Sequence, residues 1–396
     1  MFQENTIPPT VLGDNASPSR PRTGDELTDA VGQPSSTASK FRLLVDDEFQ
    51  QAFFDHLDRA KRRIYVQCMT FEGDAAGWAV AGKLLQAKAR GVDVRVVVDC
   101  FTDYYVSDTY HTHPRVAEEV QRTKAMLALF QRHGIRLVRT RPFGPAHLFV
   151  LCRNHKKVMV IDDSTYLGGV NISDHNFAWH DFMVRFDDPA LTAVTVEDFH
   201  NTCAGITVSL RSGPFVTNRH LRAAYDRLLA SAEQEIIISS PYVADLSLVR
   251  ALAAVRPDVK VKLLTLRSNN LGVVGLIAKY THRRLRSAGV EISFYRRFSH
   301  AKFLIVDRKR ALFGSSNFGL DSFLCKDEVG IATDDPLLVA ALYQRLYRAQ
   351  APNLVPYDAQ PNWRVCMGSC LASYAALLLL PLYAVLARSW GHVLQQ

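Results

Sequence analysis

Hydrophobic and polar positions follow one recurring order along the first half of the chain. Residues 62–74 form an apolar run that ends in polar residues, which predicts a strand and a turn. Residues 78–90 carry the spacing of a helix with one apolar face, and the valine-rich run at 91–100 predicts a buried strand. At 132–142 a helix is expected to end at a glycine, and another strand follows.

The second half of the chain repeats this order. Residues 234–245 predict a strand, 246–255 a helix, and 258–268 the next strand. At 287–297 a helix again ends at a glycine before a strand. An internal repeat of this kind is a stronger fold signal than any single element.

The repeat predicts an α/β fold in which helices pack over sheets. We expect two similar halves, residues 41–195 and 196–355, that share one functional site. Residues 1–40 differ, because they are rich in Pro, Ser, Thr and Gly and contain few large apolar side chains. Such a segment cannot bury enough surface to offset the entropy of ordering, so we expect a flexible arm there.

Each half also contains the same polar pattern within an apolar run. The first copy reads HKKVMVID from residue 155, and the second reads HAKFLIVD from residue 300. A turn and a glycine-led segment follow each copy, GGVN in the first half and GSSN in the second. Further on, each half places an acidic residue beside an apolar run. The residues of this pattern are His155, Lys157, Asp162, Asn171 and Asp181 in the first half, and His300, Lys302, Asp307, Asn317 and Glu328 in the second.

Strand geometry separates the polar residues of each copy into two groups. Side chains alternate between faces of a strand, so His155 and Lys157 share one face and Asp162 lies on the other. The same parity holds for Asp307 in the second copy. We therefore expect the two aspartates to brace a turn or a neighbouring strand. The asparagines follow the turn and can return to the neighbourhood of the histidine and lysine.

Two copies of His, Lys and Asn suit the transfer of a phosphodiester. An imidazole can act as a nucleophile or as a general acid near neutral pH. Lysine and asparagine supply positive charge and N–H donors to the nonbridging oxygens, which gain charge as the group transfers. One histidine would form a phosphohistidine, and the other would protonate the leaving alcohol and then deprotonate the incoming one. This chemistry needs no metal ion or other cofactor, and the sequence shows no tight carboxylate cluster for a metal.

Composition narrows the class of partner only in part. The net charge of +8 and the pI near 9.1 favour anionic partners such as nucleic acid, anionic lipid or phosphate-bearing substrates. The seven cysteines are scattered and contain no CxxC pair, so neither a disulfide framework nor a zinc site is indicated. We interpret them as buried fillers, and a reducing compartment fits best.

The C-terminal part of the chain is apolar and uncharged between residues 365 and 387. A helix that crosses a bilayer core needs about 20 such residues, so we predict a membrane segment at 363–390. A buried terminal helix and a re-entrant or interfacial segment remain alternatives, because Pro381 would kink a span. Arg345, Arg348 and Arg364 precede the uncharged run and only Arg388 follows it closely, which favours a cytoplasmic location for the main body.

The paired motifs resemble the HKD motifs of the phospholipase D superfamily over about residues 41–350. The sequences MTFEGD, ARGVDVRVVVD and HD at 180–181 are most similar to bacterial cardiolipin synthases. The resemblance implies a sheet-and-helix sandwich for each half, with a pseudo-twofold axis between the halves and both histidines at their interface. It also implies a role for each motif residue: His155 as nucleophile, His300 as general acid and base, Lys157, Lys302, Asn171 and Asn317 as phosphoryl ligands, and Asp181 and Glu328 as partners that orient an imidazole, each in the other half.

We therefore expect a membrane-associated phosphatidyltransferase of the cardiolipin synthase type at the bacterial inner membrane. Its substrates would be phospholipids such as phosphatidylglycerol, and no nucleic acid is expected. One alternative is a phospholipase D-type hydrolase, which differs in how well the closed site excludes water. A nuclease would fit the positive charge, but a soluble nuclease has no use for the apolar segment. The last alternative is a non-catalytic lipid-binding or scaffold protein. The sequence leaves the oligomeric state open.

Overall fold

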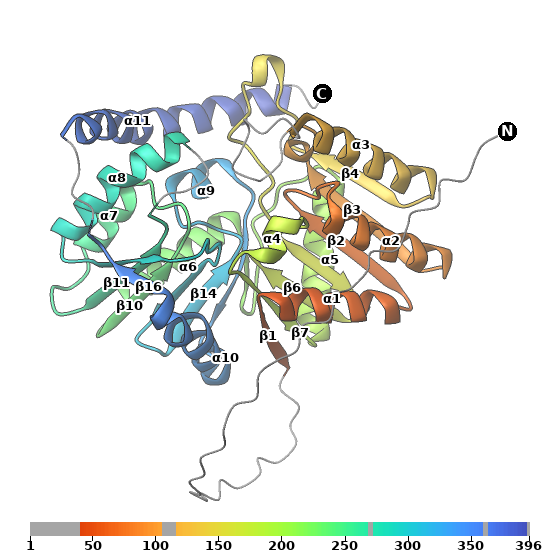
Figure 1. Cartoon of the computed structure of the whole chain (residues 1–396), viewed down its shortest axis with the longest axis horizontal. Helices are drawn as coiled ribbons and strands as arrows, with labels where there is room; N and C mark the ends of the chain where they lie inside the picture. The colour runs from red at the N-terminus through yellow and green to blue at the C-terminus, as the bar shows by residue number, and fades with distance from the viewer. Residues whose placement is uncertain (1–39, 105–115, 268–271, 359–362, 394–396) are drawn as a thin grey trace, which may run out of the picture. The chain divides into compact units, whose positions relative to one another are not determined.

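The computed structural model describes residues 40–104, 116–267, 272–358 and 363–393 (Figure 1). The flexible arm expected at residues 1–40 therefore lies outside the described residues, apart from its last position. The described chain contains two mixed sheets with helices packed on them.

The first sheet has the strand order β1-β7-β6-β5-β2-β3-β4. Strands β2, β3 and β4 run parallel, whereas β5, β6 and β7 form antiparallel hairpins. Its strands are β1 (Phe41–Val45), β2 (Arg63–Cys68), β3 (Asp93–Asp99), β4 (Arg136–Thr140), β5 (Val158–Ile161), β6 (Ser164–Gly168) and β7 (Phe182–Phe186). The helices of this half are α1 (Asp47–Arg59), α2 (Ala75–Ala89), α3 (Val116–Arg132), α4 (Asp174–Ala178) and α5 (Pro189–Cys203).

The second sheet has the order β16-β12-β11-β10-β13-β14-β15-β9-β8. Its strands are β8 (Arg211–Ser212), β9 (Phe215–Thr217), β10 (Glu235–Ser239), β11 (Lys260–Thr265), β12 (Glu291–Tyr295), β13 (Phe303–Val306), β14 (Arg310–Gly314), β15 (Val329–Thr333) and β16 (Leu354–Pro356). The helices that follow the first half are α6 (Asn218–Ala230), α7 (Leu246–Ala253), α8 (Gly272–Ser287), α9 (Leu320–Cys325), α10 (Pro336–Leu342) and α11 (Trp363–Val393). Short 3-10 or π turns lie at Cys100–Asp103, Pro145–His147, Tyr343–Tyr347 and Arg348–Asn353.

The two sheets repeat one topology, which confirms the predicted duplicated α/β fold. The parallel strands β2-β3-β4 correspond to β10-β11-β12, and the hairpin strands β5-β6-β7 correspond to β13-β14-β15. The expected division after residue 195 falls inside α5, which packs on β5 and β6 of the first sheet. The first half therefore extends at least to Cys203.

Side chains that alternate between the two faces of the motif strands contribute to three hydrophobic cores. Val158 and Val160 of β5 face a central core that contains side chains of both sheets, including Phe303 of β13. Met159 of β5 faces the opposite way, into the core between the first sheet and its helices. Leu304 of β13 does the same for the second half. The sheets thus meet through a shared apolar layer, which fixes the ends of the motif strands relative to one another.

The aspartates that end the two motifs each hold a turn. The Asp162 carboxylate accepts hydrogen bonds from the backbone N–H groups of residues 61, 62 and 63, just before β2. Asp307 accepts from the N–H groups of residues 233, 234 and 235 in the equivalent place. Both aspartates have positive φ, 50° and 53°, a conformation that Asp and Asn adopt more easily than other side chains. These bonds tie each hairpin turn to the neighbouring parallel strand.

The C-terminal helix α11 packs against α7, α8 and α9 of the second half (Figure 1). Its inward face consists of small residues, because Ser369, Ser373, Ala384 and Ala387 are buried. The outward face carries large apolar side chains that are exposed: Met367, Leu371, Tyr374, Leu378, Leu379, Leu382, Val385 and Leu386. Residues 367–387 form the one helix in the described part of the chain that is long and apolar enough to cross a membrane.

Candidate active site

Each motif histidine is paired with an acidic residue of the other half. His155 Nδ1 lies 3.0 Å from Glu328 Oε1, and His300 Nδ1 lies 2.9 Å from Asp181 Oδ2. All four side chains are buried. Because Nδ1 of each ring faces a carboxylate, Nε2 is the nitrogen left to act on a substrate. The acids stand directly before β7 and β15, so the sheet edge of one half orients the imidazole of the other.

Backbone hydrogen bonds between the halves hold these pairs. The N–H of His155 donates to the carbonyl of Asp327 over 2.9 Å, and the N–H of His300 donates to the carbonyl of His180 over 2.8 Å. In both cases the acceptor is the residue before the acid. The histidines therefore lie in extended segments that pair with the opposite half, and β5 itself begins only at Val158.

The two motif lysines are fully buried and arranged alike. Lys157 Nζ donates to the carbonyl of His155 over 2.8 Å, and Lys302 Nζ donates to the carbonyl of His300 over 2.5 Å. Burial, together with the nearby charge of Lys302, lowers the pKa of Lys157 to about 7. Burial lowers the pKa of Lys302 to about 8, against the opposing effect of Asp181. An anionic ligand close to these two buried amines would favour their charged forms.

The motif asparagines lie close to the same backbone segments. Asn171 and Asn317 are both buried. Asn171 Oδ1 accepts hydrogen bonds from the N–H groups of Met69 and Thr70, which leaves its Nδ2 group as a donor. The carbonyl of Asn317 accepts a hydrogen bond from the Ser240 hydroxyl over 2.8 Å. Each asparagine is thus fixed against the loop that follows the first parallel strand of its half.

The two histidine–acid pairs differ in their electrostatics. Burial lowers the pKa of His155 well below its usual value, and Lys157, Lys326 and Lys302 lower it further. Burial also lowers the pKa of His300, to about 4, although the Asp181 carboxylate opposes that change.

The two acids shift in opposite directions. Burial acts to raise the pKa of Asp181, but Lys302 and the hydrogen bond with His300 outweigh it, so the carboxyl titrates below its usual range. Burial raises the pKa of Glu328 above its usual range. His300 therefore faces the more strongly ionised acid and His155 the less ionised one.

The glycine-led segments explain why one half uses Asp and the other Glu. At Gly169 an ideal Cβ would lie 2.5 Å from Asp181 Oδ2, so the carboxylate occupies the space of a side chain. The equivalent position in the second half is Ser315, whose hydroxyl donates a hydrogen bond to Glu328. A role for this serine was not predicted, although the change from GGVN to GSSN is visible in the sequence.

A second set of residues, which the sequence did not mark as functional, lies near the motif histidines. Arg153 and Asp99 form a buried ion pair at 2.8 Å. The Asp99 carboxylate also accepts from the N–H of Asn154 over 2.6 Å, directly before His155. On the other side, the Trp179 ring lies 5.4 Å from the His300 ring. No sequence pattern marked these residues, because their partners are distant along the chain.

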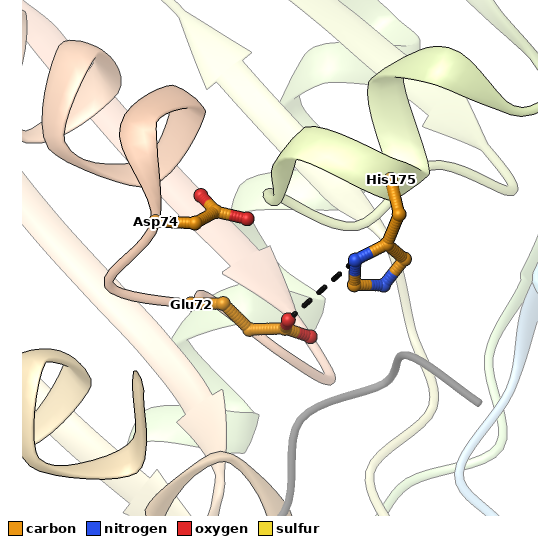
Figure 2. A group of neighbouring side chains, drawn as sticks. All are labelled: Glu72, Asp74 and His175. Atoms are coloured by element: carbon orange, nitrogen blue, oxygen red, sulfur yellow. Dashed lines mark ion pairs between the residues drawn. The ribbon is translucent and has the colours of Figure 1, made fainter. Parts of the chain in front are cut away.

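Glu72, Asp74 and His175 form the one group in the described part of the chain whose ligand atoms lie close enough to hold a metal ion, within 4.8 Å of one another. Figure 2 shows the three side chains turned toward one another, with His175 Nδ1 3.8 Å from Glu72 Oε2. Asp74 also caps α2, because its Oδ1 accepts from the N–H of Gly77 over 2.9 Å, and Oδ2 accepts from the N–H of Asp174. The sequence did not predict that these three side chains lie close together. That the reaction needs no metal stays a prediction, which full activity in EDTA would support.

Known proteins that are similar to this chain point to one family. The family described as "Cardiolipin synthase, PLD-like domain" matches residues 53–203 and 225–349. Among curated proteins, a cardiolipin synthase of Geobacillus thermodenitrificans is 25% identical over 339 residues, which is 76% of this chain and 64% of that protein. Cardiolipin synthase A of Pseudomonas aeruginosa is 27% identical over 334 residues, 76% of this chain and 65% of that protein. The chain thus spans somewhat less than two thirds of the length of these relatives.

Among solved structures, the chain is similar to phosphatidylserine synthase of Haemophilus influenzae. The TM-score is 0.67 at 14% sequence identity, and the match covers 87% of this chain and 94% of that chain. At this identity the similarity establishes the fold.

Proposed function

This chain belongs to the cardiolipin synthase, PLD-like family of the phospholipase D superfamily, and from that membership we propose that it is a phosphatidyltransferase. The observation that carries the proposal is the pair of buried imidazoles, each oriented by an acid of the opposite half, beside two buried lysines. Such a site suits an anionic phosphodiester and two proton-transfer steps.

We assign the nucleophile to His155. Its Nε2 would attack phosphorus, and the bond from phosphorus to the leaving glycerol oxygen would break. A nucleophilic imidazole must be neutral, and the lowered pKa of His155 favours that form, while burial raises the pKa of its partner Glu328. The covalent product is a phosphohistidine at position 155.

We assign the general acid and base to His300. Burial lowers the pKa of His300, and the ionised Asp181 opposes that change and so stabilises the imidazolium that must give its proton to the leaving alkoxide. The neutral His300 then removes the proton of the incoming alcohol, whose oxygen attacks phosphorus and releases His155. Lys157, Lys302 and the Nδ2 groups of the asparagines would bind the nonbridging oxygens throughout.

The proposed substrates are phospholipids such as phosphatidylglycerol, because the matched family and relatives are cardiolipin synthases by name. A cardiolipin synthase reaction joins the phosphatidyl group of one lipid to an alcohol of another. A hydrolase would use the same residues and pass the group to water, so the products decide between them.

We further propose that α11 attaches the catalytic body to the surface of an anionic bilayer. The outward face of α11 presents large apolar side chains, and α8 beside it exposes Lys279, Arg284 and Arg286. Apolar side chains flanked by cations suit acyl chains and anionic headgroups. The proposed location is the bacterial inner membrane, with the body on the cytoplasmic side. Cleavage of the body by a protease outside sealed spheroplasts would contradict that side.

The deciding experiment incubates the detergent-solubilised protein with phosphatidylglycerol and phosphatidylethanolamine and identifies the products by mass. Cardiolipin formed by the parent protein and absent with His300→Ala supports the transferase. Phosphatidic acid alone would instead identify a hydrolase. Cleavage of DNA without any lipid turnover would indicate a nuclease, and no turnover of either would indicate a non-catalytic protein.

A further inference from the structure

Cys152 of the first half and Cys325 of the second half lie against each other beside the candidate active site. The two thiols are hydrogen-bond partners. Both cysteines are free, Cys325 is buried at the end of α9, and Cys152 is half-buried. The thiol pair therefore spans the interface between the halves.

A backbone bridge two residues further along holds the two cysteines close to each other. Asn154 and Asp327 form a parallel bridge, supported by hydrogen bonds of 2.9 Å from the N–H of His155 to the carbonyl of Asp327 and from the N–H of Asp327 to the carbonyl of Arg153. Cys152 precedes Asn154 by the same two positions by which Cys325 precedes Asp327. This bridge fixes both cysteines two residues from a contact between the halves, and their thiols lie within hydrogen-bond reach of each other.

The surroundings of Cys152 favour a reactive thiolate. Hydrogen bonds from Cys325 and from the Tyr383 hydroxyl of α11, with the charges of Arg141 and Arg153, outweigh burial and lower the pKa of Cys152 to about 6. Burial instead raises the pKa of Cys68 to about 12, so that thiol stays protonated. A thiolate next to a second thiol is the usual arrangement for reversible disulfide formation.

We propose that Cys152 and Cys325 are a redox-sensitive pair that a peroxide converts into a disulfide between the halves, and that this disulfide slows the reaction. The Cys152 thiolate attacks one oxygen of hydrogen peroxide, the O–O bond breaks, and hydroxide leaves and becomes water. The resulting sulfenic acid is attacked by the sulfur of Cys325, whose proton leaves with the displaced hydroxyl group as a second water. Each cysteine loses one electron, and the peroxide is reduced to two waters.

The effect on catalysis follows from the position of the pair. His155 and Glu328 each lie three residues after one of the cysteines, and they are separated along the chain by the same 173 residues as the cysteines. A disulfide requires the sulfurs to lie about 2.05 Å apart, closer than hydrogen-bonded thiols. Closing that gap displaces the two segments that align the His155–Glu328 pair. A displacement approaching 1 Å can cost about 100-fold in rate, so we expect a fall of about tenfold or more.

The test uses the full chain in detergent, reduced with dithiothreitol and then exposed to hydrogen peroxide. Non-reducing peptide mass spectrometry should show a cross-link between the peptides of Cys152 and Cys325, and dithiothreitol should remove it. Phosphatidyl transfer should fall with cross-linking and recover on reduction. Cys152→Ser and Cys325→Ser should each prevent both changes, whereas Cys203→Ser on α5 should behave as the parent protein.

The outcomes separate this proposal from the proposed function, on which only the activity measurement rests. A reduced protein without phosphatidyl transfer would count against the proposed function, while its cross-link would still support the cysteine pair. An active protein that forms no cross-link between Cys152 and Cys325 would overturn the pair. A quantitative cross-link with unchanged turnover would overturn the regulatory effect.

Discussion

The carboxylate of Asp181 occupies the space in which a side chain at Gly169 would lie. In the second half the equivalent position is Ser315, and its hydroxyl donates a hydrogen bond to the longer Glu328 side chain. The two halves are thus similar in topology but not interchangeable in chemistry. The shorter acid, close to a glycine and strongly ionised, faces His300, and this asymmetry gives the histidines different expected roles.

Substitution of Gly169 by Ala should impair the acid and base step. The added methyl group would displace the Asp181 carboxylate from His300 Nδ1, so we expect turnover to fall about 100-fold, within the range that general acid–base catalysis contributes. Gly82→Ala is the matched control, because a Cβ at this position of α2 meets no atom within 4 Å. Steady-state phosphatidyl transfer and thermal unfolding should be measured together. Unchanged turnover in a folded Gly169→Ala protein would show that the Asp181 position is not needed.

The roles of the two histidines can be separated with an activated substrate. A phosphatidyl p-nitrophenyl ester has a leaving group that needs no proton, so His300→Ala should still release about one equivalent of nitrophenol in a burst. His155→Ala should release none, because no covalent bond to phosphorus can form. The phosphorylated residue in His300→Ala should be identified by mass spectrometry of its peptides. A burst in His155→Ala, with phosphate on residue 300, would reverse the assignment.

The motif lysines predict a loss of activity at alkaline pH. A lysine with a lowered pKa is charged below that pKa and neutral above it, so attraction for the phosphodiester weakens as pH rises through about 7 for Lys157 and about 8 for Lys302. We expect kcat/KM to fall about tenfold or more between pH 7 and pH 9, because kcat/KM reports groups of the free enzyme. Lys83→Ala, at an exposed ion pair with Asp58, should leave the profile unchanged. A flat profile to pH 9 would contradict the lowered lysine pKa values.

Asp162 should contribute to stability and not to the chemical step. Its carboxylate accepts three backbone hydrogen bonds, and Asp162→Ala should lower the free energy of unfolding by about 1–3 kcal/mol. The neighbouring Asp163→Ala is the control, because its ion pairs are exposed and worth about 1 kcal/mol or less. Urea denaturation gives the stability, and kcat per folded molecule should stay near the parent value. A loss of kcat at unchanged stability would instead give Asp162 a catalytic role.

Much of the fold and the motif residues could be predicted, because the same local pattern of strands, helices and polar residues occurs in both halves of the sequence. The pairing of His155 with Glu328 was expected only from the resemblance to the phospholipase D superfamily, since nothing local links residues so far apart. The Cys152–Cys325 pair was not predicted, because its residues meet across the interface between the halves. The group of Glu72, Asp74 and His175 was not predicted either, because a tertiary contact within the first half brings α4 to the loop after β2. The sequence likewise predicted an apolar C-terminal segment but not which of its faces is buried. That depends on the helices against which the small residues of α11 pack.

The attachment of α11 to a bilayer can be tested on its outward face. Leu378→Glu combined with Leu382→Glu places two charges among exposed apolar side chains, and each leucine contributes about 1.5–3 kcal/mol when buried. We expect binding to phosphatidylglycerol vesicles, measured by sedimentation, to fall more than about tenfold. Leu337→Glu on α10 is the matched control, because Leu337 is similarly exposed, at 68%, on a different helix. Because the inward face of α11 is packed on the protein, alkaline carbonate should release the parent protein from membranes. Resistance to carbonate, together with normal vesicle binding of the double variant, would instead show that α11 leaves the body and spans the bilayer.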